Sequence, residues 1–268
     1  MQPPVRVDPH VKVLSDRVVH RAKQRGLDAL VYAPHFVPLP VIKRRAARFS
    51  DDDFLVVPGR EVFTGDWRHR KHVLAIGLSE PVPDFITLTA AMQAFDRQDA
   101  TVLIPHPEFA TVSCSAVDCR RYRRTIDAVE VYNPKYLRSH TRRAHRLVDT
   151  LDVTSFGSSY AHLPATVGDV WTTLNPSEAI DTPDDLVRAL ASAPRRVARR
   201  TDRCARIQAL AERAHLAWEN SWKKIDRVIL SGSTATRPDQ PIYEGRFDDN
   251  TVYSTEQGII ESIRTALQ

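Results

Sequence analysis

The sequence predicts an α/β protein with a mainly parallel sheet. Over about the first two-thirds of the chain, short apolar runs of strand length alternate with amphipathic stretches of helical period. The runs follow one another at short spacing, as in repeated strand–helix units. These observations fit an open sheet as well as a sheet closed into a barrel, and periodicity alone does not separate the two.

The apolar runs define the expected strands, and the amphipathic stretches define the helices between them. Gly26 ends the first helix, and Thr87 is a suitable N-cap for the third. The expected strands are Val5–Val11, Ala29–Tyr32, Leu55–Val57, His72–Ile76, Thr101–Ile104, Ala128–Tyr132, Val153–Phe156 and Val167–Thr173. The expected helices are Asp16–Arg25, Val41–Phe49, Thr87–Arg97, Asp118–Arg124, Ser139–Leu151 and Asp185–Ser192.

The character of the chain changes after Pro183. From Pro194 it becomes rich in arginine, and we expect a helix that continues to about Lys224, with Ile207 and Leu210 on the face that packs inward. We therefore predict an α/β domain over residues 1–192. A helical and loop extension, residues 193–268, is expected to pack on it.

Composition favours an ordinary globular protein with anionic partners. Hydrophobic residues make up 42% of the 268 residues and charged residues 26%. The net charge of +5 suits a phosphate ester or a nucleic acid. Residues 1–7 hold no signal-peptide run, and prolines interrupt the most apolar stretch, Leu27–Ile42, so we expect a cytoplasmic protein. The three cysteines form no CxxC pair, and we expect reduced thiols.

Ligand-type side chains lie near or just after the ends of five of the expected strands. The carboxyl ends of parallel strands lie at one edge of the sheet, so these side chains could converge there. Imidazole and carboxylate together are ligands for zinc, manganese or iron. Any one histidine is more often a hydrogen-bonded structural residue, but five such strand ends favour a metal site. The residues are His10, His35, Glu61, His106 and His162.

A series of short motifs follows in order over about residues 5–190. They are Val7–Lys12, Ser15–Asp16, Ala33–His35, Pro58–Glu61, His72–Gly77, Ile104–Pro107, Val129–Asn133 and Gly157–His162. In this order they resemble the motifs of the PHP (polymerase and histidinol phosphatase) family: its opening HxH, Ser-Asp, Asp-His, Pro-Gly-x-Glu, His-hydrophobic-Gly, His-Pro, a strand near the end of its barrel, and its final Gly-Ser-Asp-x-His. The resemblance implies a distorted seven-stranded (β/α)7 barrel with up to three metal ions at its rim.

The resemblance also implies an activity and a set of site residues. The activity is hydrolysis of a phosphate ester through a metal-activated water, with one or two divalent ions (Zn, Mn or Fe) per chain and up to three. By analogy, Glu61, His72 and His106 share one metal, and Glu61 bridges to a second. Asp16, His35 and His162 hold a third. The implied metal ligands are His10, Asp16, His35, Glu61, His72, His106 and His162, and the implied catalytic residues are Glu61, His10, Lys12 and Arg60.

Two departures from the family pattern fall on the metal that His10 also holds. Lys12 replaces the second opening histidine, and Tyr160 replaces the carboxylate of the last motif. A protonated lysine has no lone pair to give to a metal. Our hypothesis is that the Lys12 ammonium stands in for this metal and stabilises a phosphoryl oxyanion. The alternative is an inert barrel with decayed ligands.

A second function class is a degenerate PHP barrel that binds or cuts nucleic acid. Arg196, Arg199, Arg200 and Arg203 would share one face of the expected C-terminal helix. Such a stripe could track a phosphate backbone. A solvated helix face remains the alternative, because Asp202 and Glu212 dilute the charge.

Overall fold

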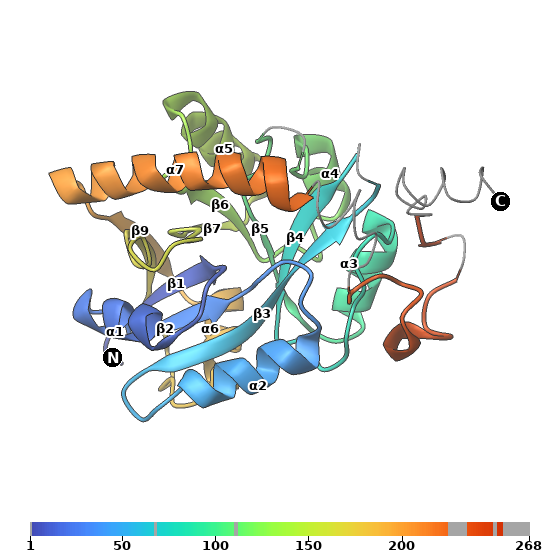
Figure 1. The fold of residues 1–268 in the computed structure, drawn as a ribbon, viewed down its shortest axis with the longest axis horizontal. Helices are drawn as coiled ribbons and strands as arrows, with labels where there is room; N and C mark the ends of the chain where they lie inside the picture. The colour runs from blue at the N-terminus through green and yellow to red at the C-terminus, as the bar shows by residue number, and fades with distance from the viewer. Residues whose placement is uncertain (1, 67–68, 110–111, 225–234, 249–250, 254–268) are drawn as a thin grey trace.

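The computed structural model of the chain describes residues 2–66, 69–109, 112–224, 235–248 and 251–253. Within these residues, nine strands form one sheet in the order β7-β6-β5-β4-β3-β2-β1-β8-β9 (Figure 1). The strands are β1 Val5–Val11, β2 Ala29–Tyr32, β3 Leu55–Thr64, β4 Lys71–Ile76, β5 Thr101–Ile104, β6 Ala128–Tyr132, β7 Thr154–Gly157, β8 Val170–Leu174 and β9 Arg195–Arg199. The helices are α1 Asp16–Gln24, α2 Leu39–Phe49, α3 Leu88–Asp96, α4 Ala116–Arg121, α5 Arg138–Leu151, α6 Pro183–Ser192, α7 Arg203–Lys224 and the 3-10 helix η2 Pro241–Tyr243.

Most of the strands run in one direction, as the strand–helix alternation predicts. β1 to β3 pair in parallel, and so do β5 to β7. β4 lies antiparallel between β3 and β5, and β8 lies antiparallel between β1 and β9. β9 therefore runs parallel to β1, and the carboxyl ends of β1 and β9 lie at the same rim of the sheet.

The two ends of the sheet approach each other, so that the sheet is nearly closed into a barrel. The Gly157 N–H in β7 donates to Thr172 Oγ1 in β8 at 3.0 Å, and that hydroxyl donates to the Gly157 carbonyl at 2.9 Å. The α/β barrel-like fold is confirmed. The expected count of seven strands is not, because β8 and β9 extend the sheet beyond β1.

Helix α6 closes the end of the barrel opposite the rim. Leu186 and Leu190 share a buried cluster with Val31 and Leu74 of the strands. The Thr101 hydroxyl, at the start of β5, donates to a carbonyl of α6 at 3.1 Å. Two further buried clusters lie outside the sheet, one beneath α3, α4 and α5 and the other beneath α1 and α2. This packing leaves the opposite end of the barrel for polar residues.

The prediction of a helix from Pro194 is wrong over its first residues. Arg195–Arg199 is strand β9, which pairs with β8, and α7 begins only at Arg203. Side chains alternate along a strand, so Arg196, Arg199, Arg200 and Arg203 do not share a helix face. The sheet thus continues past the expected boundary at residue 192. Residues 225–234, 249–250 and 254–268 of the expected extension lie outside the described residues.

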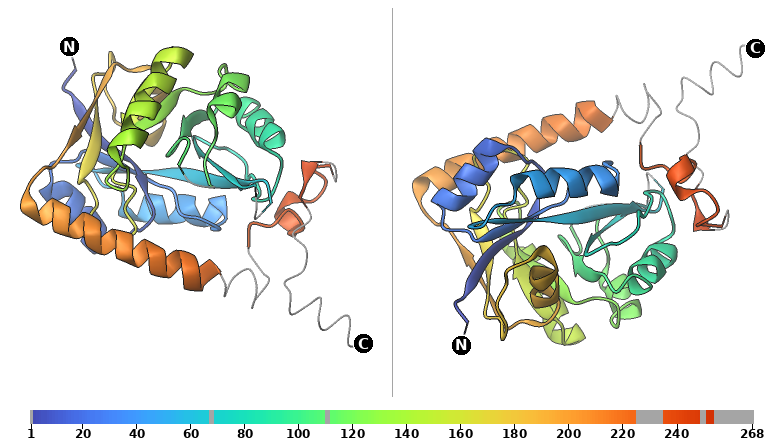
Figure 2. Two further views of the ribbon diagram at one scale, coloured as in Figure 1. Left: turned by 90° about the horizontal axis from the view of Figure 1, so that it is seen from above. Right: turned by 90° about the horizontal axis from the view of Figure 1, so that it is seen from below.

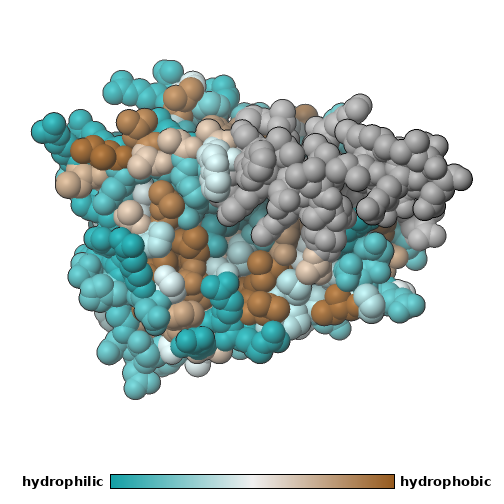
Figure 3. Space-filling model, viewed as in Figure 1, coloured by the Kyte–Doolittle hydropathy of each residue, from teal (hydrophilic) through white to brown (hydrophobic). Residues whose placement is uncertain are grey.

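Helix α7 runs along one side of the barrel, as Figures 1 and 2 show together. Its inward face contains Ala205 and Glu212, which are buried. Ile207 and Leu210, expected on that face, are instead 60% and 68% exposed. Figure 3 shows hydrophobic side chains at the surface along this helix. None of the described helices is both long and apolar enough to cross a lipid bilayer.

Gly59 of β3 offers a test of the barrel packing. A Cβ atom at this position would lie 2.5 Å from Val31 Cγ1 and 3.3 Å from Ala33 Cβ. We expect Gly59→Ala to lower the free energy of unfolding by about 1–3 kcal/mol, because overpacking forces neighbouring side chains to move. Urea unfolding followed by circular dichroism measures the change. In the double variant Gly59→Ala/Val31→Ala, the loss of both valine γ-methyl groups makes room for the new Cβ. The double variant should therefore lose less unfolding free energy than the sum of the two single losses; additive losses would contradict this packing.

Candidate metal centre

Glu61 lies at the centre of the rim site. Strand β3 continues to Thr64, past the short run expected from sequence, so Glu61 is inside the strand and not after it. Side chains alternate along β3. Val57 belongs to the cluster inside the barrel, and Val62 belongs to the cluster beneath α3. Glu61 therefore faces the inside of the barrel, where it is fully buried.

Four imidazoles and one ammonium surround the Glu61 carboxylate. The imidazoles come from the end of β1, the turn after β2, the start of β4 and the turn after β5. Three groups lie beside Oε2: His10 Nε2 at 3.3 Å, His35 Nε2 at 3.0 Å and Lys12 Nζ. Two lie beside Oε1: His72 Nδ1 at 3.3 Å and His106 Nε2 at 3.1 Å. The structure thus gathers five of the residues that the sequence proposed for the site around the sixth.

The direction of β4 explains how His72 reaches this site. His72 is the second residue of its strand, whereas the other three histidines lie near or beyond the carboxyl ends of their strands. Because β4 is antiparallel to β3, with His72 opposite Phe63, the start of β4 lies at the same rim. Phe36, His106 and Tyr160 have positive φ values of 54°, 35° and 48° in the turns at this rim. Such strained backbone is typical of functional sites.

Burial and the Lys12 charge set the ionisation of the site. Burial lowers the pKa of His10 to about 3 and the pKa of His35 well below its ordinary value, and Lys12 adds to both shifts. Burial would raise the pKa of Glu61, but Lys12 and the imidazoles outweigh it and hold that pKa well below its ordinary value. Burial lowers the pKa of Lys12 to about 8, against the attraction of Glu61. Neutral imidazoles around an ionised carboxylate are the protonation states that metal binding requires.

The donor set fits a divalent cation. Both ring nitrogens of His10 and of His72, and Nδ1 of His35, are buried without a hydrogen-bond partner among the described residues. Two of them lie 3.3 Å from Glu61 but are not aligned for a hydrogen bond. Buried polar groups are almost always satisfied, so unsatisfied imidazoles point to a missing partner. One ligand atom from each of His35, Glu61 and His72 lies within 4.8 Å of the others. Imidazole with carboxylate suits zinc, manganese or iron.

Lys12 contacts the Glu61 carboxylate directly, and Tyr160 packs on two of the imidazoles around it. The Lys12 ammonium donates to Glu61 and, at 2.6 Å, to the Ala33 carbonyl. The Tyr160 ring packs on His10 and His106, with centroids 4.7 Å and 5.2 Å apart. An ammonium and an aromatic ring thus lie beside His10, where the family pattern has a histidine and a carboxylate.

Three of the proposed site residues lie outside this cluster. His162 Nδ1 is 2.9 Å from the Tyr160 carbonyl, and His162 N–H donates to Glu212. Asp16 is the exposed first residue of α1. Arg60 faces away from Glu61, on the other side of β3, where its Nη2 lies 2.6 Å from Asp84 Oδ2. His162 therefore adjoins the cluster, whereas Asp16 and Arg60 make no contact with its imidazoles.

Sequence reasoning missed three charged residues that support the site. Glu130 Oε2 accepts from His106 N–H at 2.8 Å and so fixes the turn after β5. Lys135 Nζ lies 3.9 Å from the centroid of Tyr160 and 3.5 Å from Glu212 Oε1. A glutamate between two valines of a predicted strand was a usable signal for Glu130. No sequence signal pointed to Glu212, because its role depends on where α7 docks.

The family model that matches is described as PHP-associated and covers residues 138–193. Together with the barrel-like fold and the motif residues gathered at its rim, this match supports an assignment to the PHP family. No protein of curated function matches the chain by sequence.

Solved structures with a similar fold include PsfC from Pseudomonas syringae PB-5123, which has a TM-score of 0.60 and 20% identity. The match covers 80% of this chain and 100% of PsfC. An amidohydrolase from Chromobacterium violaceum, solved with sulfate and no metal, has a TM-score of 0.50 and 13% identity. The match covers 73% of this chain and 98% of the amidohydrolase chain. A candidate metal-dependent phosphoesterase from Bifidobacterium adolescentis has a TM-score of 0.47 and 13% identity. The match covers 69% of this chain and 95% of the phosphoesterase chain. The first two similarities establish the fold alone, and the third is too weak to carry an argument.

The surroundings of Arg60 predict a structural contribution. Its guanidinium binds Asp84, which also accepts from Phe63 N–H at 2.7 Å and from the Thr236 hydroxyl. We expect Arg60→Met to lower the free energy of unfolding by about 3–5 kcal/mol, because it leaves a buried carboxylate unpaired. Urea unfolding checks this. The matched control is Arg188→Met, which removes an exposed partner of Asp185 and should cost less than about 1 kcal/mol. Equal stability of the two variants would contradict the structural assignment.

Proposed function

We propose that this PHP protein is a metal-dependent phosphoesterase whose site is the histidine cluster around Glu61. One observation carries the proposal: neutral, unsatisfied imidazoles converge on a buried, ionised carboxylate at the barrel rim. His35, Glu61 and His72 would hold a divalent cation, with His106 on the same carboxylate oxygen as His72. The bound cation would supply Lewis acidity and an activated water for attack on a phosphate ester.

The side chains of the protein have separate tasks in this proposal. The Glu61 carboxylate holds the imidazoles in position, and the charge of Lys12 keeps that carboxylate ionised. The Lys12 ammonium, fixed by two acceptors, would add positive charge for a phosphoryl oxyanion. His10 stays neutral because burial and Lys12 both disfavour its charged form. Asp16 and His162 remain proposed ligands of a further ion, which would require them to approach each other.

The second candidate function is a degenerate PHP barrel that binds or cuts nucleic acid. Arg199 ends β9 at the rim and Arg203 begins α7 soon after it, and these arginines favour this candidate. Binding of RNA or DNA that weakens with salt and survives chelation of metal would support it. Hydrolysis of an aryl phosphate that is lost on chelation would support the phosphoesterase.

Removal of a central ligand tests the metal site. We expect His72→Ala to lower the metal content of the purified protein and to reduce hydrolysis of an aryl phosphate at least about 100-fold. The physical reason is that loss of groups that merely orient a ligand already costs 10–100-fold. Elemental analysis and a colorimetric assay, before and after chelation and reloading, provide the readouts. His20→Ala, at an exposed position of α1, is the matched control and should change neither. Full metal content in His72→Ala would refute the proposed ligand set.

Substitution of Lys12 tests whether its ammonium replaces a metal. We expect Lys12→His, which restores the residue of the family motif, to raise the bound metal by up to one ion per chain. An imidazole has a lone pair to give, whereas an ammonium has none. Lys12→Met removes the charge without adding a ligand and should not raise the metal content. Elemental analysis measures both variants. Three tightly bound ions in the unaltered protein would contradict the hypothesis.

A further inference from the structure

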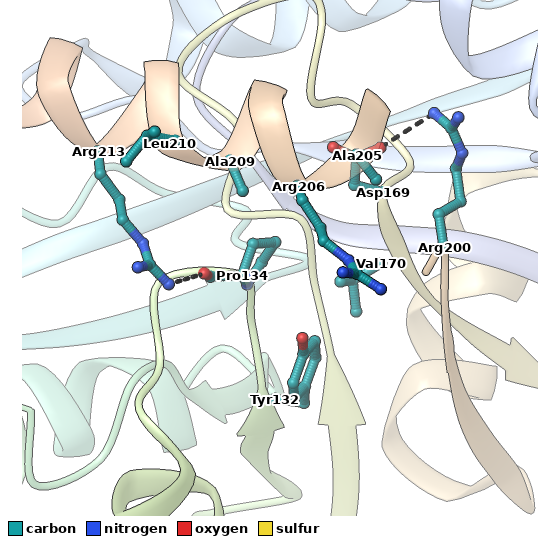
Figure 4. A pocket seen from close by; sticks show the side chains of 10 residues that line it. All are labelled: Tyr132, Pro134, Asp169, Val170, Arg200, Ala205, Arg206, Ala209, Leu210 and Arg213. Atoms are coloured by element: carbon teal, nitrogen blue, oxygen red, sulfur yellow. Dashed lines mark hydrogen bonds and ion pairs between the residues drawn. The ribbon is translucent and has the colours of Figure 1, made fainter. Parts of the chain in front are cut away.

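A second pocket lies at the rim beneath α7, outside the histidine cluster. It has a volume of about 420 Å3, within the range of ligand-binding pockets. Figure 4 shows α7 as its roof, with Tyr132 at the end of β6 and Val170 at the start of β8 below. The lining residues are Tyr132, Pro134, Asp169, Val170, Arg200, Ala205, Arg206, Ala209, Leu210 and Arg213.

The pocket carries an excess of positive charge. Three arginines and one aspartate line it, which gives a formal charge of +2. Asp169 is already bound by Arg25 at 3.0 Å and by Arg200 at 3.2 Å. Arg206 and Arg213 pair with no carboxylate of the described residues, and the bonds they make are to main-chain carbonyls. Two guanidinium groups are therefore available for an anion.

Arg206 and Arg213 are exposed residues of α7, seven positions apart, and both line the pocket. Arg213 donates to the Pro134 carbonyl at 2.7 Å, which fixes its guanidinium at the mouth of the pocket. Figure 4 shows the Arg206 guanidinium and the Tyr132 hydroxyl pointing into the same space. A planar guanidinium binds phosphate oxygens in pairs, and a hydroxyl adds a further donor.

The remaining wall is apolar, which argues against a bare inorganic ion. Val170, Ala205, Ala209 and Leu210 line it, and the ring of Tyr132 lies beneath Arg199, whose Cζ is 4.5 Å from the ring centroid. An organic group attached to the phosphate would cover this apolar surface. A partly apolar organic group that carries a phosphate, as in a nucleotide, matches both halves of the pocket.

A layer of paired charges separates this pocket from the histidine cluster. Lys135 follows the lining residue Pro134, and Glu212 precedes the lining residue Arg213. Their side chains are 3.5 Å apart, and Lys135 also covers the Tyr160 ring. The pocket is therefore a distinct site at the same rim, and its binding can be measured without a metal in the cluster.

We propose that this pocket binds the phosphate and adjoining base or sugar of a nucleotide, through Arg206, Arg213 and the Tyr132 hydroxyl. The site does not require the chain to be a phosphoesterase. The nucleotide can be a free molecule or a unit of a single strand, and both offer the same chemistry.

Calorimetric titration of the full chain in chelator tests the proposal, with AMP, adenosine and a short single-stranded DNA as separate probes. AMP or the DNA should bind, whereas adenosine, which lacks the phosphate, should not. Arg206→Ala and Arg213→Ala should each weaken binding about tenfold, the effect of losing one charge-assisted hydrogen bond. The matched controls are Arg196→Ala and Arg203→Ala, which remove the same charge from exposed positions that do not line the pocket. These should weaken binding less than about twofold.

Each outcome decides the question. Tighter binding of AMP than of DNA identifies a free nucleotide, and the reverse order identifies a strand. Equal losses in the pocket variants and the controls would overturn the proposal in favour of diffuse charge attraction. Failure of the unaltered protein to bind either probe at millimolar concentration would overturn it outright. The His72→Ala variant, expected to lose metal and hydrolysis, should bind the nucleotide probes unchanged. Failure of one proposal can therefore be distinguished from failure of the other.

Discussion

The buried carboxylate of Glu61 is the constraint on which the rim of this barrel depends. A carboxylate out of contact with water is costly unless charges and donors surround it. Here the Lys12 ammonium provides the charge, and four imidazoles complete the shell. The groups come from β1, β3, β4 and the turns after β2 and β5, so most of the sheet must close correctly before Glu61 has its partners. Fold and site are therefore specified together.

Much of the fold could be predicted from the sequence, because an apolar strand can be recognised where its pairing in the sheet and the burial of its side chains agree. Ala29–Tyr32, Thr101–Ile104 and Ala128–Tyr132 form strands with the predicted bounds. The prediction stopped β3 short of Thr64, because Arg60 and Glu61 break the apolar run, and their burial depends on partners from other elements. It assigned Arg195–Arg199 to a helix, because arginine favours helices and the pairing with β8 that stabilises a strand is a tertiary interaction.

The identity of most site residues could be predicted from the sequence, but their arrangement in space could not. Ordered motifs identified the residues that gather on Glu61, since strand ends meet at one rim. Asp16 was proposed from its motif alone, and its place at the start of α1 leaves it exposed. The layer of Lys135 and Glu212 could not be foreseen, because it joins the turn after β6 to a helix whose docking the sequence does not specify.

Lys12 and Tyr160 are best understood as a pair. One buried ammonium beside one buried carboxylate is nearly neutral, and a second carboxylate at position 160 would leave an excess negative charge next to Glu61. The tyrosine ring avoids that charge, and its face attracts cations: Lys12 and Lys135 lie 5.8 Å and 3.9 Å from its centroid. Glu212 then balances Lys135. Lysine and tyrosine thus complete the surroundings of Glu61 and His10 without a metal, whereas the unsatisfied nitrogens of His35 and His72 have the chemistry to hold one.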